Sequence, residues 1–260
     1  MASEPVGVRD LPPGYTEWPA PAGLRHAIAC LWAQVTPDGA RDRDALVLPD
    51  ACSDLIWEQG RGAYVAGPDT GPVSTVMKAG TVVLGVRFRP SAGGPVLGLP
   101  LSELRDQRVD LDDLRHRDAR RLPGSLDPDT AAIRVLDLAA ALVADGDPDP
   151  AAARAAVLLA DPRARAEDVA ANIGLSMRQL RRRCHAVVGY SPKTLQRVLR
   201  FRRFVARLDA GLPSGQDTHD LAALAAQAGY ADQAHLTREC RALAGLTPAA
   251  LARQRGPAAG

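Results

Sequence analysis

Apolar and polar residues alternate in short runs through the first half of the chain, and glycine or proline residues separate the runs. Such alternation, with β-branched residues at the apolar positions, is typical of strands that bury one face. The pattern predicts six strands, at 26–34, 45–48, 54–58, 63–66, 73–77 and 81–88. Strands of this length and spacing favour a small antiparallel barrel or sandwich of the cupin type.

Beyond residue 100 the apolar residues recur every three or four positions instead, which is the period of a helix with one buried face. This period predicts helices at 101–105 and 130–143 and further helices in the rest of the chain. The segment DGDPDP at 145–150 reads as a linker that ends in a helix cap. A calcium loop there would need Glu at its twelfth position, where Ala156 stands.

The expected fold class is therefore α+β, with a mostly β barrel or sandwich domain followed by an all-α bundle. The expected divisions are a disordered N-terminus at 1–14, a β-rich sensor-like domain at 15–125, a helix and linker at 126–150, and a helical domain at 151–256.

The helical half repeats one pattern. Gly174 follows a short apolar helix, where a tight turn favours positive φ, and Ser176 is a suitable N-cap for the next helix. Four anchor residues of this unit recur 56 positions later: Leu180, Cys184, Gly189 and Pro192 correspond to Leu236, Cys240, Gly245 and Pro248. A helix, a glycine turn and a capped second helix form a helix-turn-helix unit, whose second helix enters the major groove of DNA. The sequence therefore predicts two such units.

A long helix is expected between the two units, from Ser191 and Pro192 to about Leu208. A helix of that length spans about 25 Å. With the bundle packed at both ends, it would hold two reading helices about 34 Å apart, which is one turn of DNA. One chain would then read two successive major-groove segments without dimerising.

Charge is divided unevenly between the halves. Residues 151–256 hold 17 Lys and Arg against 8 Asp and Glu, whereas the whole chain holds 32 against 30. A basic helical domain attached to an acidic one indicates a polyanionic partner, and arginine can hold a phosphate or read guanine. The residues expected near DNA are Met177, Arg178, Arg181, Arg182, Lys193, Arg200, Arg203, Asp232, Gln233, Ala234, His235 and Arg238. Of these, Arg178 and Arg181 are favoured for guanine, Gln233 for adenine and Asp232 for cytosine.

The segment 151–254 resembles the DNA-binding domain of the AraC/XylS family of transcriptional regulators. The stretch that carries the resemblance is AAQAGYADQAHLTREC at 225–240, with GLTP at 245–248. Cys184 and Cys240 stand where the family usually has Phe. The resemblance implies seven helices, promoter DNA as partner, RNA polymerase as a further partner of an activator, and frequently an N-terminal domain that senses a small molecule or dimerises.

The N-terminal half is similar to a poorly characterised sensor-like domain of some of these regulators, through LPDACSDLIW at 48–57 and GVRFRP at 85–90. Trp32, Asp54, Trp57, Arg87 and Arg89 are candidates for a pocket that binds an anionic or aromatic effector. The alternative is that both tryptophans belong to the core and that Arg87 and Asp54 form a structural ion pair.

Enzyme functions find little support, because the chain has no nucleophile elbow, phosphate loop or His-x-x-x-His metal motif. No cofactor or metal is expected. A DNA-repair methyltransferase, which needs four zinc-binding cysteines, is one alternative function, and a protein-interaction module without DNA is another. The cysteines are widely spaced, and no segment reads as a signal peptide or membrane span, so we expect a cytoplasmic protein.

Overall fold

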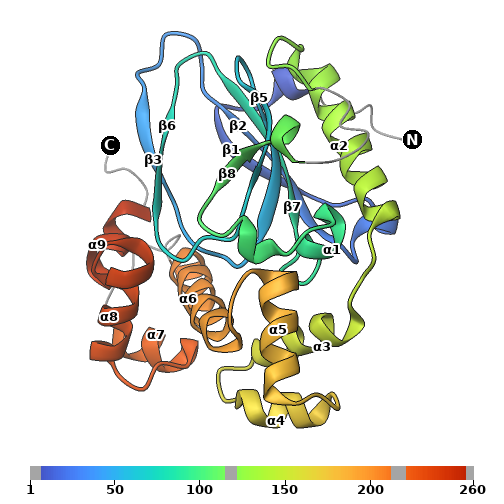
Figure 1. The fold of residues 1–260 in the computed structure, drawn as a ribbon. Helices are drawn as coiled ribbons and strands as arrows, with labels where there is room; N and C mark the ends of the chain where they lie inside the picture. Colours follow the sequence, from blue (N-terminus) through green and yellow to red (C-terminus); the bar gives the residue numbers. More distant parts are fainter. Residues whose placement is uncertain (1–6, 115–121, 212–220, 256–260) are drawn as a thin grey trace.

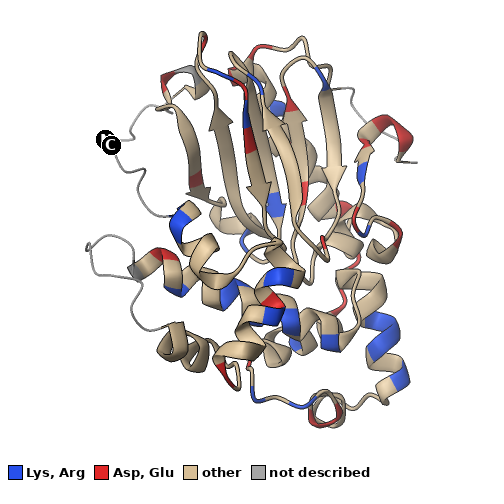
Figure 2. Ribbon diagram, turned by 90° about the vertical axis from the view of Figure 1, so that its left-hand side faces the viewer, with Lys and Arg blue, Asp and Glu red and all other residues tan. Residues whose placement is uncertain are grey.

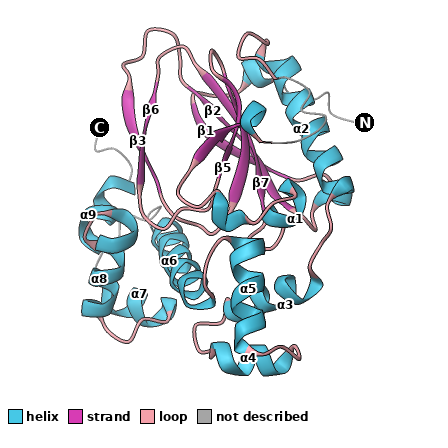
Figure 3. Ribbon diagram, viewed as in Figure 1, coloured by secondary structure: helices cyan, strands magenta, loops and turns pink. Residues whose placement is uncertain are grey.

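The computed structural model describes residues 7–114, 122–211 and 221–255 (Figure 1). This part of the chain forms a β-sheet domain followed by a helical domain, which confirms the expected fold class. Figure 3 shows the strands apart from the helices of the second half of the chain, whereas the helix α2 (Pro128–Asp145) lies beside the sheet. Within the described residues, no helix has the length and apolar character that crossing a bilayer requires.

The sheet domain contains a six-stranded antiparallel sheet in the order β1-β2-β7-β4-β5-β8 and a separate ribbon of β3 and β6. The strands are β1 (Gly14–Pro19), β2 (Ile28–Val35), β3 (Arg43–Val47), β4 (Ser53–Glu58), β5 (Gly62–Ala66), β6 (Val73–Met77), β7 (Val82–Phe88) and β8 (Arg108–Asp110). In Figure 1 the ribbon faces one side of the sheet and α2 lies on the other. Leu55, Trp57 and Phe88 point to the α2 side, where they are fully buried.

All six predicted strands are present, with ends that differ by a few residues. The edge strand β1 was not predicted, since its polar residues and terminal proline do not read as a strand. The three-residue β8 is too short to leave a pattern. The predicted helix 130–143 is α2, whose cap is Asp127: its carboxylate accepts the Thr130 N–H at 3.0 Å.

Two local expectations were wrong. The segment 101–105 forms only a short 3-10 helix, η3 (Leu101–Glu103), and the helix α1 (Gly93–Leu97) was not predicted because two glycines begin it. The expected disorder does not extend to Val8, which is buried and donates its N–H to Asp129 Oδ1 at 2.6 Å. The rest of that expectation, at 1–6, lies outside the described residues.

The helical domain consists, in its described part, of seven helices, the number that the resemblance implied. They are α3 (Pro150–Leu159), α4 (Ala166–Asn172), α5 (Met177–Val188), α6 (Pro192–Gly211), α7 (Leu221–Ala228), α8 (Gln233–Ala244) and α9 (Pro248–Arg255). The linker ends in a helix cap as predicted, because the Asp149 carboxylate accepts the Ala152 N–H at 3.0 Å.

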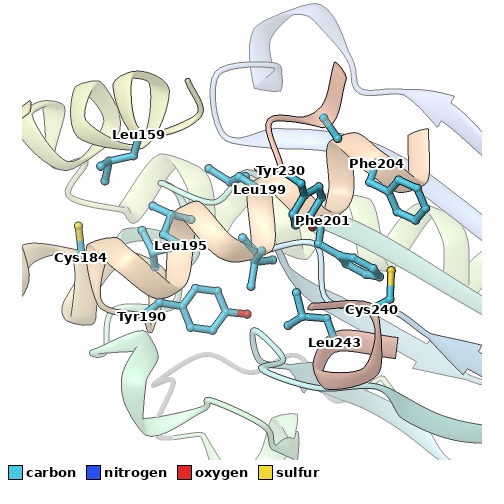
Figure 4. Close-up of a cluster of buried hydrophobic side chains, with 14 of the residues drawn as sticks. Leu159, Cys184, Tyr190, Leu195, Leu199, Phe201, Phe204, Tyr230, Cys240 and Leu243 are labelled. Carbon is cyan, nitrogen blue, oxygen red and sulfur yellow. The ribbon is translucent and has the colours of Figure 1, made fainter. Parts of the chain in front are cut away.

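A single hydrophobic core joins the two helical hairpins around α6 (Figure 4). Phe201 and Phe204 of α6 are fully buried in it, together with Leu195. Cys184 and Cys240 are also buried there, at 1% and 0% exposure, so the thiols occupy the core positions that the resemblance assigned to Phe. Burial raises the pKa of Cys184 to about 11 and that of Cys240 to about 12.

The two domains are in close contact. A Cβ atom added at Gly94 of α1 would lie 2.4 Å from the carbonyl oxygen of Ala186 on α5, so the backbones of these helices touch. The hydroxyl of buried Tyr190, just beyond α5, donates to the carbonyl oxygen of Asp69 in the sheet domain. The sheet domain therefore packs against the C-terminal end of α5.

Candidate nucleic-acid interface

The first helix-turn-helix unit is built from α4 and α5. Gly174 between them has φ +70°, as the tight turn requires, and Ser176 caps α5. The Gln179 N–H donates to Ser176 Oγ at 3.3 Å, while the Ser176 N–H donates to Gln179 Oε1 at 2.8 Å. This reciprocal capping box makes α5 begin at Met177, the predicted position.

The second unit is built from α7 and α8 in the same way. Gly229 has φ +92°, and the Asp232 carboxylate caps α8 by accepting the His235 N–H at 2.6 Å. The ring of His235 meets the ring of Tyr230 edge-on, with the centroids 5.1 Å apart. Leu236 and Cys240 face the core, at 0% exposure each, as the repeat predicted.

Both second helices leave their predicted reading residues at the surface. On α5 the side chains of Met177, Arg178, Arg181 and Arg182 are exposed. On α8 and at its cap, Asp232, Gln233, Ala234 and Arg238 are exposed, and His235 is half-buried. Figure 1 shows α5 and α8 at the two ends of the helical domain, with α6 between them.

The first unit also forms a basic groove. It lies where the N-terminal ends of α4, α5 and α6 come together, and its walls include Arg165, Arg178, Arg181 and Lys193, opposite one acidic residue, Glu167. Helix N-termini carry partial positive charge and free backbone N–H groups. Four cations and converging helix ends make this groove suited to a phosphate backbone. Arg165 was not predicted, because as a lone residue before α4 it carries no pattern.

Figure 2 shows Lys and Arg concentrated on the helical domain, as the charge division indicated. The second unit is less basic than the first. The residues predicted to read DNA there include one exposed acidic residue, Asp232, and one exposed arginine, Arg238. The two units are thus alike in backbone and unlike in charge.

Comparison of the sequence with known families agrees with this geometry. The profile of a family described as a helix-turn-helix domain matches residues 169–254, and that of a domain of unknown function (DUF6597) matches 16–110. The helical half is an AraC-type DNA-binding domain. The protein is accordingly a DNA-binding transcription regulator of the AraC type, with a DUF6597 domain at its N-terminal side. No curated protein sequence matches it significantly.

Solved structures of ToxT from Vibrio cholerae are similar in part. ToxT of strain O395 is 8% identical, with a TM-score of 0.44 over 82% of this chain and 94% of that chain. ToxT of the same strain bound to (E)-4-(8-methylnaphthalen-1-yl)but-3-enoic acid is 10% identical, with a TM-score of 0.47 over 83% of this chain and 100% of that one.

Two predicted DNA contacts of this AraC-type domain have partners inside the protein. Arg200 is half-buried, and its guanidinium lies 5.6 Å from the centre of the Tyr230 ring. Arg203 is half-buried as well and donates to two backbone carbonyl oxygens, of Ala160 and Ala228. Lys193, by contrast, is exposed in the basic groove.

Three of the five effector candidates meet on the sheet face that points away from α2. The Trp32 indole N–H donates to Asp54 Oδ1 at 2.6 Å, and Arg87 Nε donates to the same oxygen at 3.2 Å. Arg87 also pairs with Glu17 at 3.1 Å and with Asp50 at 3.4 Å. Burial raises the pKa of Asp54 to about 6, although Arg87 acts in the opposite direction. Glu17 was missed because β1 was not predicted.

The other two candidates lie elsewhere. Trp57 is fully buried on the α2 side of the sheet, where its indole N–H donates to the Pro123 carbonyl oxygen at 3.0 Å. Arg89 is exposed and donates to the Arg25 carbonyl oxygen at 2.6 Å. A pocket formed by all five residues is therefore a wrong expectation, and only Trp32, Asp54 and Arg87 form one cluster.

Proposed function

We propose that this regulator binds specific promoter sequences by placing α5 and α8 in two successive major-groove segments. The observation that carries the proposal is that two helices of matching sequence and capping, held by one core around α6, both leave their outward residues exposed. The groove beside α5 adds a site for the phosphate backbone. Promoter DNA is cytoplasmic in bacteria, so we place the protein there.

Each helix is proposed to read different bases. Arg178 and Arg181 of α5 suit the O6 and N7 atoms of guanine, with Arg182 and Lys193 on phosphates. On α8, Gln233 suits adenine, and Arg238 suits guanine or a phosphate. Asp232 keeps one carboxylate oxygen for cytosine N4, because only Oδ1 accepts the N–H at the helix cap.

Selection of bound duplexes from a random DNA pool tests this function. The full chain is expected to enrich two short boxes whose centres lie about 10 base pairs apart, the G-rich box belonging to α5. The matched variants Arg178→Ala and Gln233→Ala should each lose base preference in one box and retain it in the other. Enrichment of a single box would refute reading by both units. No enrichment at all would favour a protein-interaction module without DNA.

We also propose that the N-terminal domain modulates DNA binding, through a small molecule or through self-association. Support comes from the cluster of Trp32, Asp54 and Arg87, which lies outside the apolar core, and from the packing of the sheet domain on α5. A thermal-shift screen of anionic and aromatic compounds should find one that raises the Tm of the wild-type chain and raises that of Arg87→Lys less. Absence of any stabilising compound, with a monomer by sedimentation, would contradict both forms of the proposal.

A further inference from the structure

A single side chain joins the second helix-turn-helix unit to α3, the helix that packs on the first unit. Arg203 lies in the middle of α6, and its Nη1 donates to the Ala228 carbonyl oxygen at 3.2 Å while its Nη2 donates to that of Ala160. Ala160 is the C-cap of α3, which packs on α5 in the first unit. Ala228 is the last residue of α7, directly before the turn of the second unit. One guanidinium thus holds the C-terminal end of α3, which packs on the first unit, and the C-terminal end of α7 in the second unit.

The turn of the second unit also touches the segment that joins α3 to the first unit. A Cβ atom added at Gly229, the turn glycine of the second unit, would lie 2.4 Å from Cβ and 2.8 Å from Cγ of Pro162, which follows α3. The same position is 3.9 Å from Nη1 of Arg203. Gly229, Pro162 and Arg203 therefore meet in one small contact, which we call the inter-unit seam.

Chemistry explains why arginine occupies the seam. The last carbonyl groups of a helix lack partners within the helix and carry partial negative charge. A guanidinium presents several N–H groups in a rigid plane, so it can donate to two carbonyls in different directions at once. A lysine ammonium supplies the charge at one point on a flexible stem and does not hold that geometry.

We propose that Arg203 determines the distance and angle between α5 and α8, and with them the spacing between the two DNA boxes. It is a positioning residue and not a phosphate contact, and the inference rests on the proposed reading of two boxes. A small change in the angle of α6 moves its ends far, because α6 has 20 residues and a helix of that length spans about 30 Å. A tilt of about 10° at one end displaces the other by about 5 Å, more than one base-pair step of about 3.4 Å.

The test measures affinity for the selected duplex with its native spacing and with one base pair inserted or removed. Full-length wild type, Arg203→Ala, Arg203→Lys and the control Arg207→Ala are compared at several salt concentrations. Arg207 suits the control because it is exposed on the same helix and donates to Gln227 Oε1 at 3.1 Å, without reaching the first unit.

Wild type and Arg207→Ala should prefer native spacing by about tenfold or more, the scale of one mismatched base pair. Arg203→Ala and Arg203→Lys should bind the three spacings within about threefold of each other, with the salt slope unchanged. Far-ultraviolet circular dichroism checks that each variant is folded. If Arg203→Ala does not fold, the spacing preference of Arg203→Lys alone tests the inference.

Two results overturn the inference. In the first, Arg203→Ala weakens DNA binding equally at all three spacings and reduces the salt slope by about 1, while Arg203→Lys binds like wild type. That combination would identify Arg203 as a phosphate contact. The second is retention of the native spacing preference by both folded variants. If wild type itself shows no spacing preference, the proposed two-box reading fails, and that outcome is distinct from both.

Discussion

Arg181 and Lys193 lie in the same groove, and the structure predicts that their removal has different effects. Arg181 is exposed on α5 and has neither a hydrogen bond nor an ion pair with the residues described. Arg181→Ala therefore breaks nothing in the folded protein, and its free energy of unfolding should change by less than about 0.5 kcal/mol. Any loss in DNA binding then reports on the DNA contact alone.

The magnitude follows from the proposed contact with guanine. A bidentate pair contributes about 1–3 kcal/mol of discrimination against the wrong base. This corresponds to a 5- to 160-fold preference, since 1.4 kcal/mol is about tenfold in an equilibrium constant. Arg181→Ala should lose this preference at one base pair. Lys193→Ala should weaken binding to all sequences alike and reduce the slope of log K against log salt by about 0.9.

Fluorescence anisotropy with labelled duplexes measures both quantities. Each variant is titrated against the selected duplex and against duplexes with one guanine replaced, at salt concentrations from 50 to 200 mM. Between these limits the Lys193 contact accounts for about a 3.5-fold change in affinity. Arg43→Ala is the control, because Arg43 is exposed on β3 in the sheet domain. Unchanged discrimination in Arg181→Ala would refute its assignment to a base, and an unchanged slope in Lys193→Ala would refute the phosphate contact.

Three further predictions concern stability and reactivity. Gly94→Ala should lower the free energy of unfolding by about 1–3 kcal/mol in denaturant titration, because its Cβ would meet α5, whereas Gly23→Ala, with open space around it, should not. Cys184 and Cys240 should not react with Ellman's reagent at pH 8 in the folded protein, because burial raises the pKa of both thiols. Fast modification of either thiol would contradict their burial. The pKa of Asp54 is about 6 in the folded protein, above its ordinary value of 3.8, so this carboxyl binds a proton more readily in the folded state than in the unfolded state. Its contribution to the free energy of unfolding therefore falls as the pH rises from about 4 to 6. Asp54→Asn should flatten this part of the pH profile of Tm, and an unaltered profile would count against the shift.

Much of the fold could be predicted because its causes are local. Ser176 and Gln179 cap α5 through bonds across three residues, and Gly174 has the positive φ of the short turn between α4 and α5. Such features depend on near neighbours in the chain, and the repeat displayed them twice. Six strands were predicted for the same reason. The strands β1 and β8 carry no such pattern and form because each pairs with an edge strand of the sheet, β2 or β5.

The arginines of α6 mark the limit of this reasoning. Periodicity indicates only that they lie off the apolar stripe, which makes Arg200 and Arg203 candidates for contacts with the DNA backbone. Both units and α3 pack around α6. Arg203 reaches the carbonyl oxygens of Ala160 and Ala228, and Arg200 reaches the Tyr230 ring. No local pattern shows that a helix is enclosed from two sides by segments more than twenty residues away.

The amino-acid sequence by itself determined the helices α5 and α8, their caps and the basic character of their domain, because capping, period and charge are properties of neighbouring residues. Only the tertiary structure decided which cations are free to meet DNA and which hold the protein together. It separated Arg181 in the open groove from Arg203 in the inter-unit seam, two residues of one type that differ only in what the folded chain places beside them.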